Sequence, residues 1–164
     1  MPVTVTVENG TGMPTANSYA SVAQADAYFA TRPRSTAWTG LTEDQKAQYL
    51  IHAARILDAS VVWRGEVLSS AQALAFPRYP DDLDAAEVPA VIPVAQYELA
   101  YLSIGRDLTA EPSLNGLRLI EVGPIKVEAN AATGPDLIPR WVRNLIAPYG
   151  SARGSSGNAT LTRA

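Results

Sequence analysis

The sequence contains no cysteine and only one histidine, His52, among its 164 residues. Without cysteine the chain can form neither a disulfide nor a thiolate zinc site, and it fits a reducing compartment. It also lacks a run of about 18 apolar residues and the pattern of a signal peptide, so it predicts neither a membrane span nor export. These absences lead us to expect a soluble protein made inside a cell.

Motifs of the common enzyme classes are missing as well. The chain has no P-loop, no G-x-G-x-x-G, no H-E-x-x-H and no G-x-S-x-G. His52 lies on a predicted helix near Gln48 and Ile56, and no serine or aspartate stands beside it in the sequence to form a relay. We therefore expect no enzyme, no catalytic residue and no cofactor.

A metal site is not indicated either. The acidic run of Asp81, Asp82, Asp84 and Glu87 lacks the glycine and the twelve-residue spacing of a calcium loop. We interpret it as a solvated loop.

Positive charge is scarce. The formal net charge is -3, the only lysines are Lys46 and Lys126, and the arginines are scattered along the chain. Binding to phosphates normally accompanies an excess of lysine and arginine, so the balance argues against a surface that attracts nucleic acid everywhere. The net charge does not exclude a local basic patch.

Aromatic residues occur beside arginines, an interleaving found in proteins that bind single strands. The groups are Arg32, Arg34 and Trp38, then Trp63-Arg64, then Arg140-Trp141. Trp141 falls on the apolar stripe of a predicted helix, so we place it in the core. Trp38 and Trp63 are at more open positions, where such pairs more often close a small core with the guanidinium exposed.

With 47% hydrophobic and 18% charged residues, the chain can form one domain with a core. Ser21 with Gln24, and Thr42 with Gln45, have the spacing of capping boxes and predict two helix starts. The first helix should end near Arg32-Pro33, and the second should run to about residue 60. One face of the second helix carries Leu50, Ala54, Leu57 and Val61.

Further helices are predicted over residues 71–75, 89–108 and 136–149, and a hairpin over 117–122 and 125–129. Residues 3–7 suit a short strand or an extended arm. After Gly150 the chain becomes rich in Gly, Ser and Ala. The predicted fold is mainly α, a small helical bundle with a short β-hairpin and an extended C-terminal tail. Residues 1–149 form the helical domain and 150–164 the flexible tail.

Several blocks together resemble the head–tail connector adaptors of tailed phages, a family often labelled DnaT-like single-stranded DNA-binding proteins. They are VENGTG, NSYASVAQADAYFATR, LTEDQKAQYLIHAARILDASVVWRGEVLSSAQALAFPR, EVGPIKVEA and LIAPY. The most specific element is W-R-G at residues 63–65 with Q-A-L-A-F-P-R behind it at 72–78. The similarity spans residues 7–149.

The resemblance implies a helical subunit of a homo-oligomeric ring, usually of twelve copies, in the neck of the virion and assembled in the host cytoplasm. Its partners would be the portal protein and a tail-side stopper or tail terminator protein. DNA would pass through the channel without specific binding, which suits an acidic balance. The alternative is a DnaT-like single-stranded DNA-binding protein acting in replication.

The tail provides the predicted partner-binding residues. Its composition has no acidic side chain, and it cannot bury enough apolar surface to order itself. We expect it to run in extended form along a neighbouring subunit or the portal. Leu161 would enter a small pocket there, and Arg153 and Arg163 would lie near acidic groups.

Overall fold

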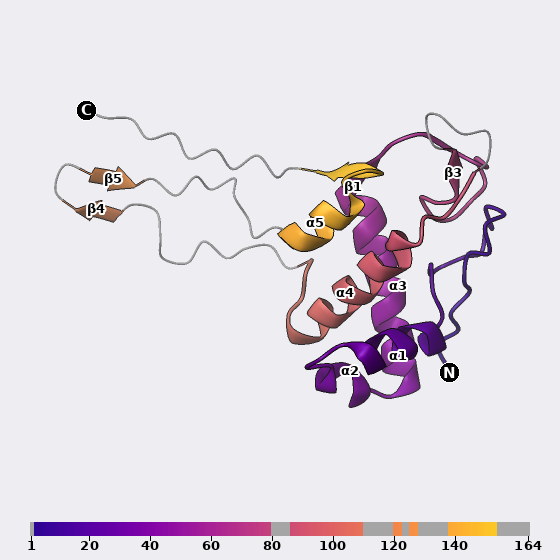
Figure 1. The fold of residues 1–164 in the computed structure, drawn as a ribbon, viewed down its shortest axis with the longest axis horizontal. Helices are drawn as coiled ribbons and strands as arrows, with labels where there is room; N and C mark the ends of the chain where they lie inside the picture. Colours follow the sequence, from indigo (N-terminus) through magenta and orange to yellow (C-terminus); the bar gives the residue numbers. More distant parts are fainter. Residues whose placement is uncertain (1, 80–85, 110–119, 123–124, 128–137, 154–164) are drawn as a thin grey trace.

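The computed structural model describes residues 2–79, 86–109, 120–122, 125–127 and 138–153. Within them the chain forms five helices and three two-stranded antiparallel sheets (Figure 1). The helices are α1 (Val22–Thr31), α2 (Thr36–Thr39), α3 (Glu43–Ser60), α4 (Val91–Gly105) and α5 (Arg140–Ile146). The sheets pair β1 (Val61–Trp63) with β6 (Gly150–Ala152), β2 (Glu66–Val67) with β3 (Arg78–Tyr79), and β4 (Ile120–Val122) with β5 (Ile125–Val127). The protein is a mixed, helix-rich small domain.

Both predicted capping boxes are present. Ser21 Oγ accepts from the Gln24 backbone N–H, and the Gln24 side chain accepts from the Ser21 N–H at 2.8 Å. Thr42 and Gln45 make the same reciprocal pair at the start of α3. Arg32 is the C-cap of α1, so that helix ends where the following proline predicted.

The centre of the core is the pairing of α3 with α4. The predicted face of α3 is confirmed, because Leu50, Ala54, Leu57 and the following Val61 are all buried. Helix α4 is buried along most of its length and carries three buried polar side chains, Gln96, Glu98 and Ser103. It contacts α2, α3 and α5, which accounts for its burial on more than one side.

The Gln96 side chain is tolerated in this core because its polar atoms are hydrogen-bonded. Its Oε1 accepts from the Tyr19 N–H at 3.0 Å, and its Nε2 donates to Ser18 Oγ at 2.7 Å and to the Leu50 carbonyl at 2.8 Å. A buried amide with all these partners bears little desolvation cost. It joins the segment before α1 to both central helices.

The residues before α1 form an extended arm, with a single parallel bridge between Val7 and Ser18. The VENGTG turn is organised by a buried carboxylate. Glu8 Oε1 accepts from the N–H groups of Gly10 and Gly12, and its Oε2 accepts from Met13 N. The motif therefore stabilises a loop.

The helix predicted over residues 71–75 is wrong, because this segment forms turns. Its backbone donors have partners outside the segment. Ala73 N donates to the Met13 carbonyl, and Ala75 N donates to Asp58 Oδ2 at 2.9 Å. Since a helix this short gains little from its own hydrogen bonds, these distant acceptors decide the conformation.

The position predicted for Trp141 is also wrong. The buried face of α5 is formed by Val142 and Ile146 and is continued by Ile138, two residues before the helix, while Trp141 is 46% exposed. Trp141 lies about 100° around the helix from the buried Val142, which places it outside the buried face. The apolar stripe predicted from the sequence included both residues and was therefore too wide. Trp38 is fully buried, as expected for an aromatic residue that closes a small core, although its position in the sequence is more open.

Residues 150–152 are part of the folded domain, which therefore extends beyond Tyr149, where the sequence placed its end. Strand β6 pairs with β1 in the register Val61 to Ala152, Val62 to Ser151 and Trp63 to Gly150. The Arg153 N–H continues this pairing by donating to the Ser60 carbonyl at 2.8 Å. A truncation that removes only the tail should begin after Arg153.

Gly150→Ala should lower the free energy of unfolding by about 1–3 kcal/mol, because overpacking displaces neighbouring atoms. A Cβ at Gly150 would lie 2.7 Å from Val61 Cγ1 and 2.8 Å from the Val62 carbonyl oxygen. Gly105→Ala is the matched control, because a Cβ there meets nothing within 4 Å. Urea unfolding should separate the two variants. Equal stabilities would show that the β1–β6 pairing tolerates a side chain.

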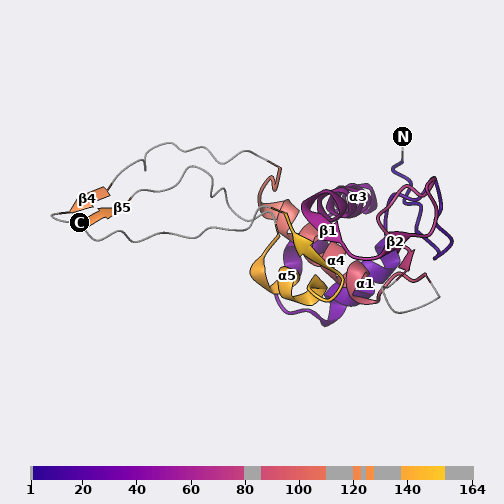
Figure 2. The same cartoon turned by 90° about the horizontal axis from the view of Figure 1, so that it is seen from above.

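The hairpin β4–β5 stands apart from the helical body in both views (Figures 1 and 2). The sequence predicted a hairpin here, and its strands pair in the register Ile120 to Val127, Glu121 to Lys126 and Val122 to Ile125. Among the described residues, no helix is long and apolar enough to cross a membrane.

Candidate functional site

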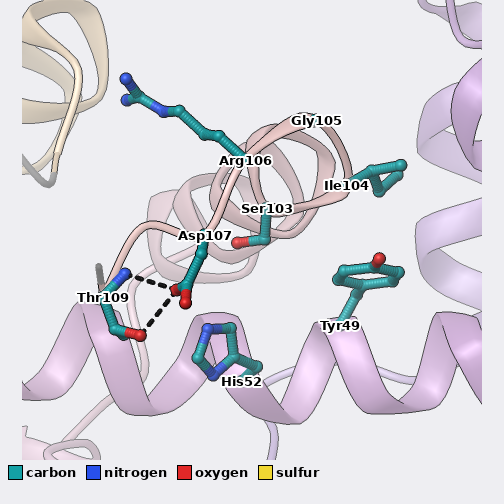
Figure 3. Close-up of a pocket in the computed structure, with 8 residues that line it drawn as sticks. All are labelled: Tyr49, His52, Ser103, Ile104, Gly105, Arg106, Asp107 and Thr109. Carbon is teal, nitrogen blue, oxygen red and sulfur yellow. Dashed lines mark hydrogen bonds between the residues drawn. The ribbon is translucent and has the colours of Figure 1, made fainter.

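A pocket of about 420 Å³ lies where the end of α4 faces α3 (Figure 3). It is lined by Tyr49, His52, Ser103, Ile104, Gly105, Arg106, Asp107 and Thr109. The pocket brings a histidine, a serine and an aspartate into one hollow. No local sequence pattern signals this, because β1, β2, β3 and most of α4 separate His52 from Ser103 and Asp107 in the chain.

The hydrogen bonds in this pocket do not activate a nucleophile. Ser103 Oγ donates to the Leu99 carbonyl at 2.8 Å, so its proton is directed at its own helix. Asp107 Oδ1 accepts from the Thr109 N–H and hydroxyl at 2.8 and 2.6 Å. A relay needs the serine hydrogen-bonded to the base, and Ser103 lacks that geometry.

In the part of the chain that the structure describes, no group of histidine and carboxylate side chains could hold a metal ion. Of the acidic run, Glu87 is exposed, and its backbone pairs with that of Arg78. Asp81, Asp82 and Asp84 lie outside the described residues.

The W-R-G and F-P-R elements are joined by one guanidinium. Arg78 donates to the Arg64 carbonyl at 2.8 Å, to the Gly65 carbonyl at 2.5 Å and to the Ala75 carbonyl at 3.2 Å. Gly65 has a φ of 71°, a conformation that favours glycine. Arginine has enough donors to satisfy three carbonyls at once. These motif residues therefore build the loop between β1 and β3.

Asp58 fastens the segment before α1 to the same loop. Its Oδ1 accepts from the Tyr19 hydroxyl at 2.7 Å and its Oδ2 from the Ala75 N–H. Burial raises the pKa of the Asp58 carboxyl to about 6, although both hydrogen bonds and the charge of Arg78 act in the opposite direction. Burial and the charge of Asp58 also raise the pKa of Tyr19, which keeps its hydroxyl a donor.

The contribution of Asp58 to stability should fall as the pH rises from 4 to 7. The folded protein holds the Asp58 proton more tightly than the unfolded chain, so this contribution is complete below pH 3.8 and is lost as the pH passes 6. The difference in unfolding free energy between wild type and Asp58→Asn isolates this group. This difference in unfolding free energy should decrease by at most about 3 kcal/mol between pH 4 and pH 7. A difference independent of pH would show that Asp58 titrates normally.

A second polar cluster joins α1 to α4. Arg32 donates through Nε and Nη2 to the two carboxylate oxygens of Glu98, each at 2.9 Å, and the Tyr28 hydroxyl donates to Glu98 Oε1 at 2.6 Å. The Arg32 guanidinium lies 4.4 Å from the centroid of the Tyr101 ring. Burial and the bond to Glu98 raise the pKa of Tyr28 to about 12, so it remains a donor. The cluster is satisfied internally, as expected of a structural element.

Arginines gather at the corner formed by α5, β1 and β6, which we call the arginine corner. Residues 60–65 and 138–153 together contain four arginines and no carboxylate: Arg64, Arg140, Arg143 and Arg153. Arg64 Nη1 donates to the Pro148 carbonyl at 3.2 Å, which ties β1 to the segment before β6. Trp141 and Val62 are exposed on the same elements. The described arginines are thus not evenly scattered, because strand pairing unites two distant segments.

Of the predicted partner-binding residues, the structure describes Arg153. Its backbone extends the β1–β6 pairing, its Nε lies 3.5 Å from the Val61 carbonyl oxygen, and its side chain is exposed. Leu161 and Arg163 lie outside the described residues. Arg153 therefore belongs to the arginine corner, which the sequence did not indicate.

A sequence profile for the family described as "Putative DnaT-like ssDNA binding protein" matches residues 3–164. No curated protein and no solved structure matches the chain significantly.

Proposed function

The chain belongs to this DnaT-like family, and we propose that it is a structural subunit of a tailed-phage head–tail connector. The observation that carries the proposal is the hairpin β4–β5, which stands apart from the helical body (Figures 1 and 2). An isolated two-stranded hairpin is marginally stable in water, so it needs another surface to pack against. A neighbouring subunit of a ring provides that surface.

Two further observations support a structural role. The pocket beside His52 has a serine whose proton is directed at a backbone carbonyl, which does not suit a nucleophile. The motifs that carry the resemblance to connector adaptors hold loops together, as Arg78 does for W-R-G. The proposed partners are further copies of the chain, the portal protein and a tail-side stopper or tail terminator protein.

Ring formation tests this proposal. We expect mass photometry and negative-stain electron microscopy to find rings of the purified protein, alone or bound to purified portal rings. Replacing residues 120–127 with a Gly/Ser linker of equal length should abolish assembly and leave the melting temperature unchanged, because the hairpin lies away from the body. A protein that stays monomeric with and without portal would contradict the proposal. If the linker variant still forms rings as the wild type does, the hairpin is not needed for assembly and no longer supports the proposal.

The second candidate is a role in replication through single-stranded DNA binding, and of these the description of the family names the DNA binding. The arginine corner favours it, since positive charge beside an exposed aromatic ring is typical of single-strand binders. The net charge of -3 weighs against a strongly binding protein.

A further inference from the structure

We propose that the arginine corner is a nucleic-acid-binding surface, on which Arg64, Arg140 and Arg153 contact phosphates and Trp141 stacks on a base. Nothing in the description of the family assigns residues to such a site. The inference identifies the surface by which this chain contacts DNA, in a connector channel or on a replication template. It does not depend on ring formation.

The fold builds this surface from two segments far apart in sequence. Strand β1 pairs with β6, and α5 contacts β6, so Arg64 lies in the same corner as residues 138–153. The Arg64 N–H donates to the Tyr149 carbonyl and the Arg153 N–H to the Ser60 carbonyl, so the two arginines flank the pairing at its opposite ends. The corner is anchored to the core by Val142 and Ile146, which are buried beneath it.

The guanidinium groups of this corner keep donors for a ligand. Arg64 donates one N–H to the Pro148 carbonyl and Arg153 one N–H to the Val61 carbonyl, and an arginine has five. Within the described part of the chain, Arg64, Arg140 and Arg153 form no ion pair with a carboxylate. Arg32 differs, because both of its contacts to Glu98 are made inside the protein.

Trp141 supplies the aromatic element. It is 46% exposed on α5, between Arg140 and the buried Val142. The exposed part of an indole can stack on any base. Trp38 is buried and Trp63 is half-buried against Phe76, so neither offers such a face.

Nucleic acid fits this corner better than an acidic protein surface does. Planar guanidinium groups bind phosphate oxygens in pairs, and the neighbouring ring adds a contact that a carboxylate-rich surface does not use. The corner has positive charge on a chain that is acidic as a whole. We therefore expect modest, salt-dependent binding without sequence preference.

The test uses the full chain and a fluorescein-labelled oligothymidylate of about 20 nucleotides, long enough for one site. Anisotropy titrations from about 50 to 200 mM salt measure the affinity and its salt dependence. The variant R64Q/R140Q/R153Q should lower the slope of log K against log salt by about 2, since each single-strand phosphate contact contributes about 0.7. Trp141→Ala should weaken binding about tenfold through lost stacking.

The matched control is R34Q/R55Q/R106Q, which removes the same charge from three other exposed arginines. It should keep the wild-type slope, and unchanged melting temperatures should show that all variants fold. Equal slopes for the two triple variants, or no binding by the wild type, would overturn the proposal. So would poly-L-glutamate binding as tight as that of the oligonucleotide and insensitive to Trp141→Ala, which would identify an acidic protein partner. Anisotropy detects DNA bound to monomer or ring, so a failure here leaves the connector proposal standing.

Discussion

Trp38→Ala should lower the free energy of unfolding by about 3–5 kcal/mol, the range for truncating a buried aromatic side chain. The Trp38 ring is fully buried and lies 4.7 Å, centroid to centroid, from Phe29. Its Nε1 donates to Asp26 Oδ1 at 2.7 Å. The substitution therefore removes packing between α1 and α2 and also a hydrogen bond to a carboxylate.

Trp141→Ala is the control for this measurement. Because Trp141 is exposed, its removal should change the unfolding free energy by less than about 0.5 kcal/mol. Urea unfolding of the two variants at one pH compares them directly. A larger loss of unfolding free energy for Trp141→Ala than for Trp38→Ala would contradict the structure, because it would show that Trp141 faces the core.

Arg32→Met should cost about 3–5 kcal/mol, because removing one partner of a buried ion pair leaves the other charge uncompensated. Glu98 is only 3% exposed and accepts from Arg32 through both carboxylate oxygens. Adding Glu98→Gln should recover part of the loss, since the double variant buries no net charge. Recovery of at least about 1 kcal/mol would be the signature of a coupled pair.

Arg55→Met is the matched control, since Arg55 is exposed on α3. It should be close to wild type in urea unfolding. An effect of Arg32→Met no larger than that of the control would show that Glu98 is solvated without its partner. Additive losses in the double variant would show that the two side chains act independently.

Local signals in the sequence were sufficient for the helix starts. Ser21 with Gln24, and Thr42 with Gln45, form capping boxes because each pair lies within one turn and needs no distant partner. The buried face of α3 followed from periodicity for the same reason. The hairpin β4–β5 also followed, since its two strands are adjacent in the chain.

Local sequence signals could not predict which tryptophan side chains are buried and which are exposed. Trp38 is on a four-residue helix without a measurable period, and its burial depends on where α1 places Phe29. Trp141 lies at the edge of an apolar stripe, and only the direction from which the core meets α5 decides which edge is covered. The same limit applies to Ala73 and Ala75, whose backbone donors find acceptors in Met13 and Asp58.

The sequence by itself determined a cysteine-free domain with two capped helices, a hairpin and a family resemblance carried by W-R-G and Q-A-L-A-F-P-R. Only the tertiary structure decided that Gly150 begins a strand, and that this strand pairs with β1 so that Arg64 and Arg153 lie at the two ends of one short ladder, next to α5. The physical reason is that the pairing of β1 with β6 joins segments separated by most of the C-terminal half of the chain. Such contacts depend on how the helices pack, and no short-range pattern of residues records them.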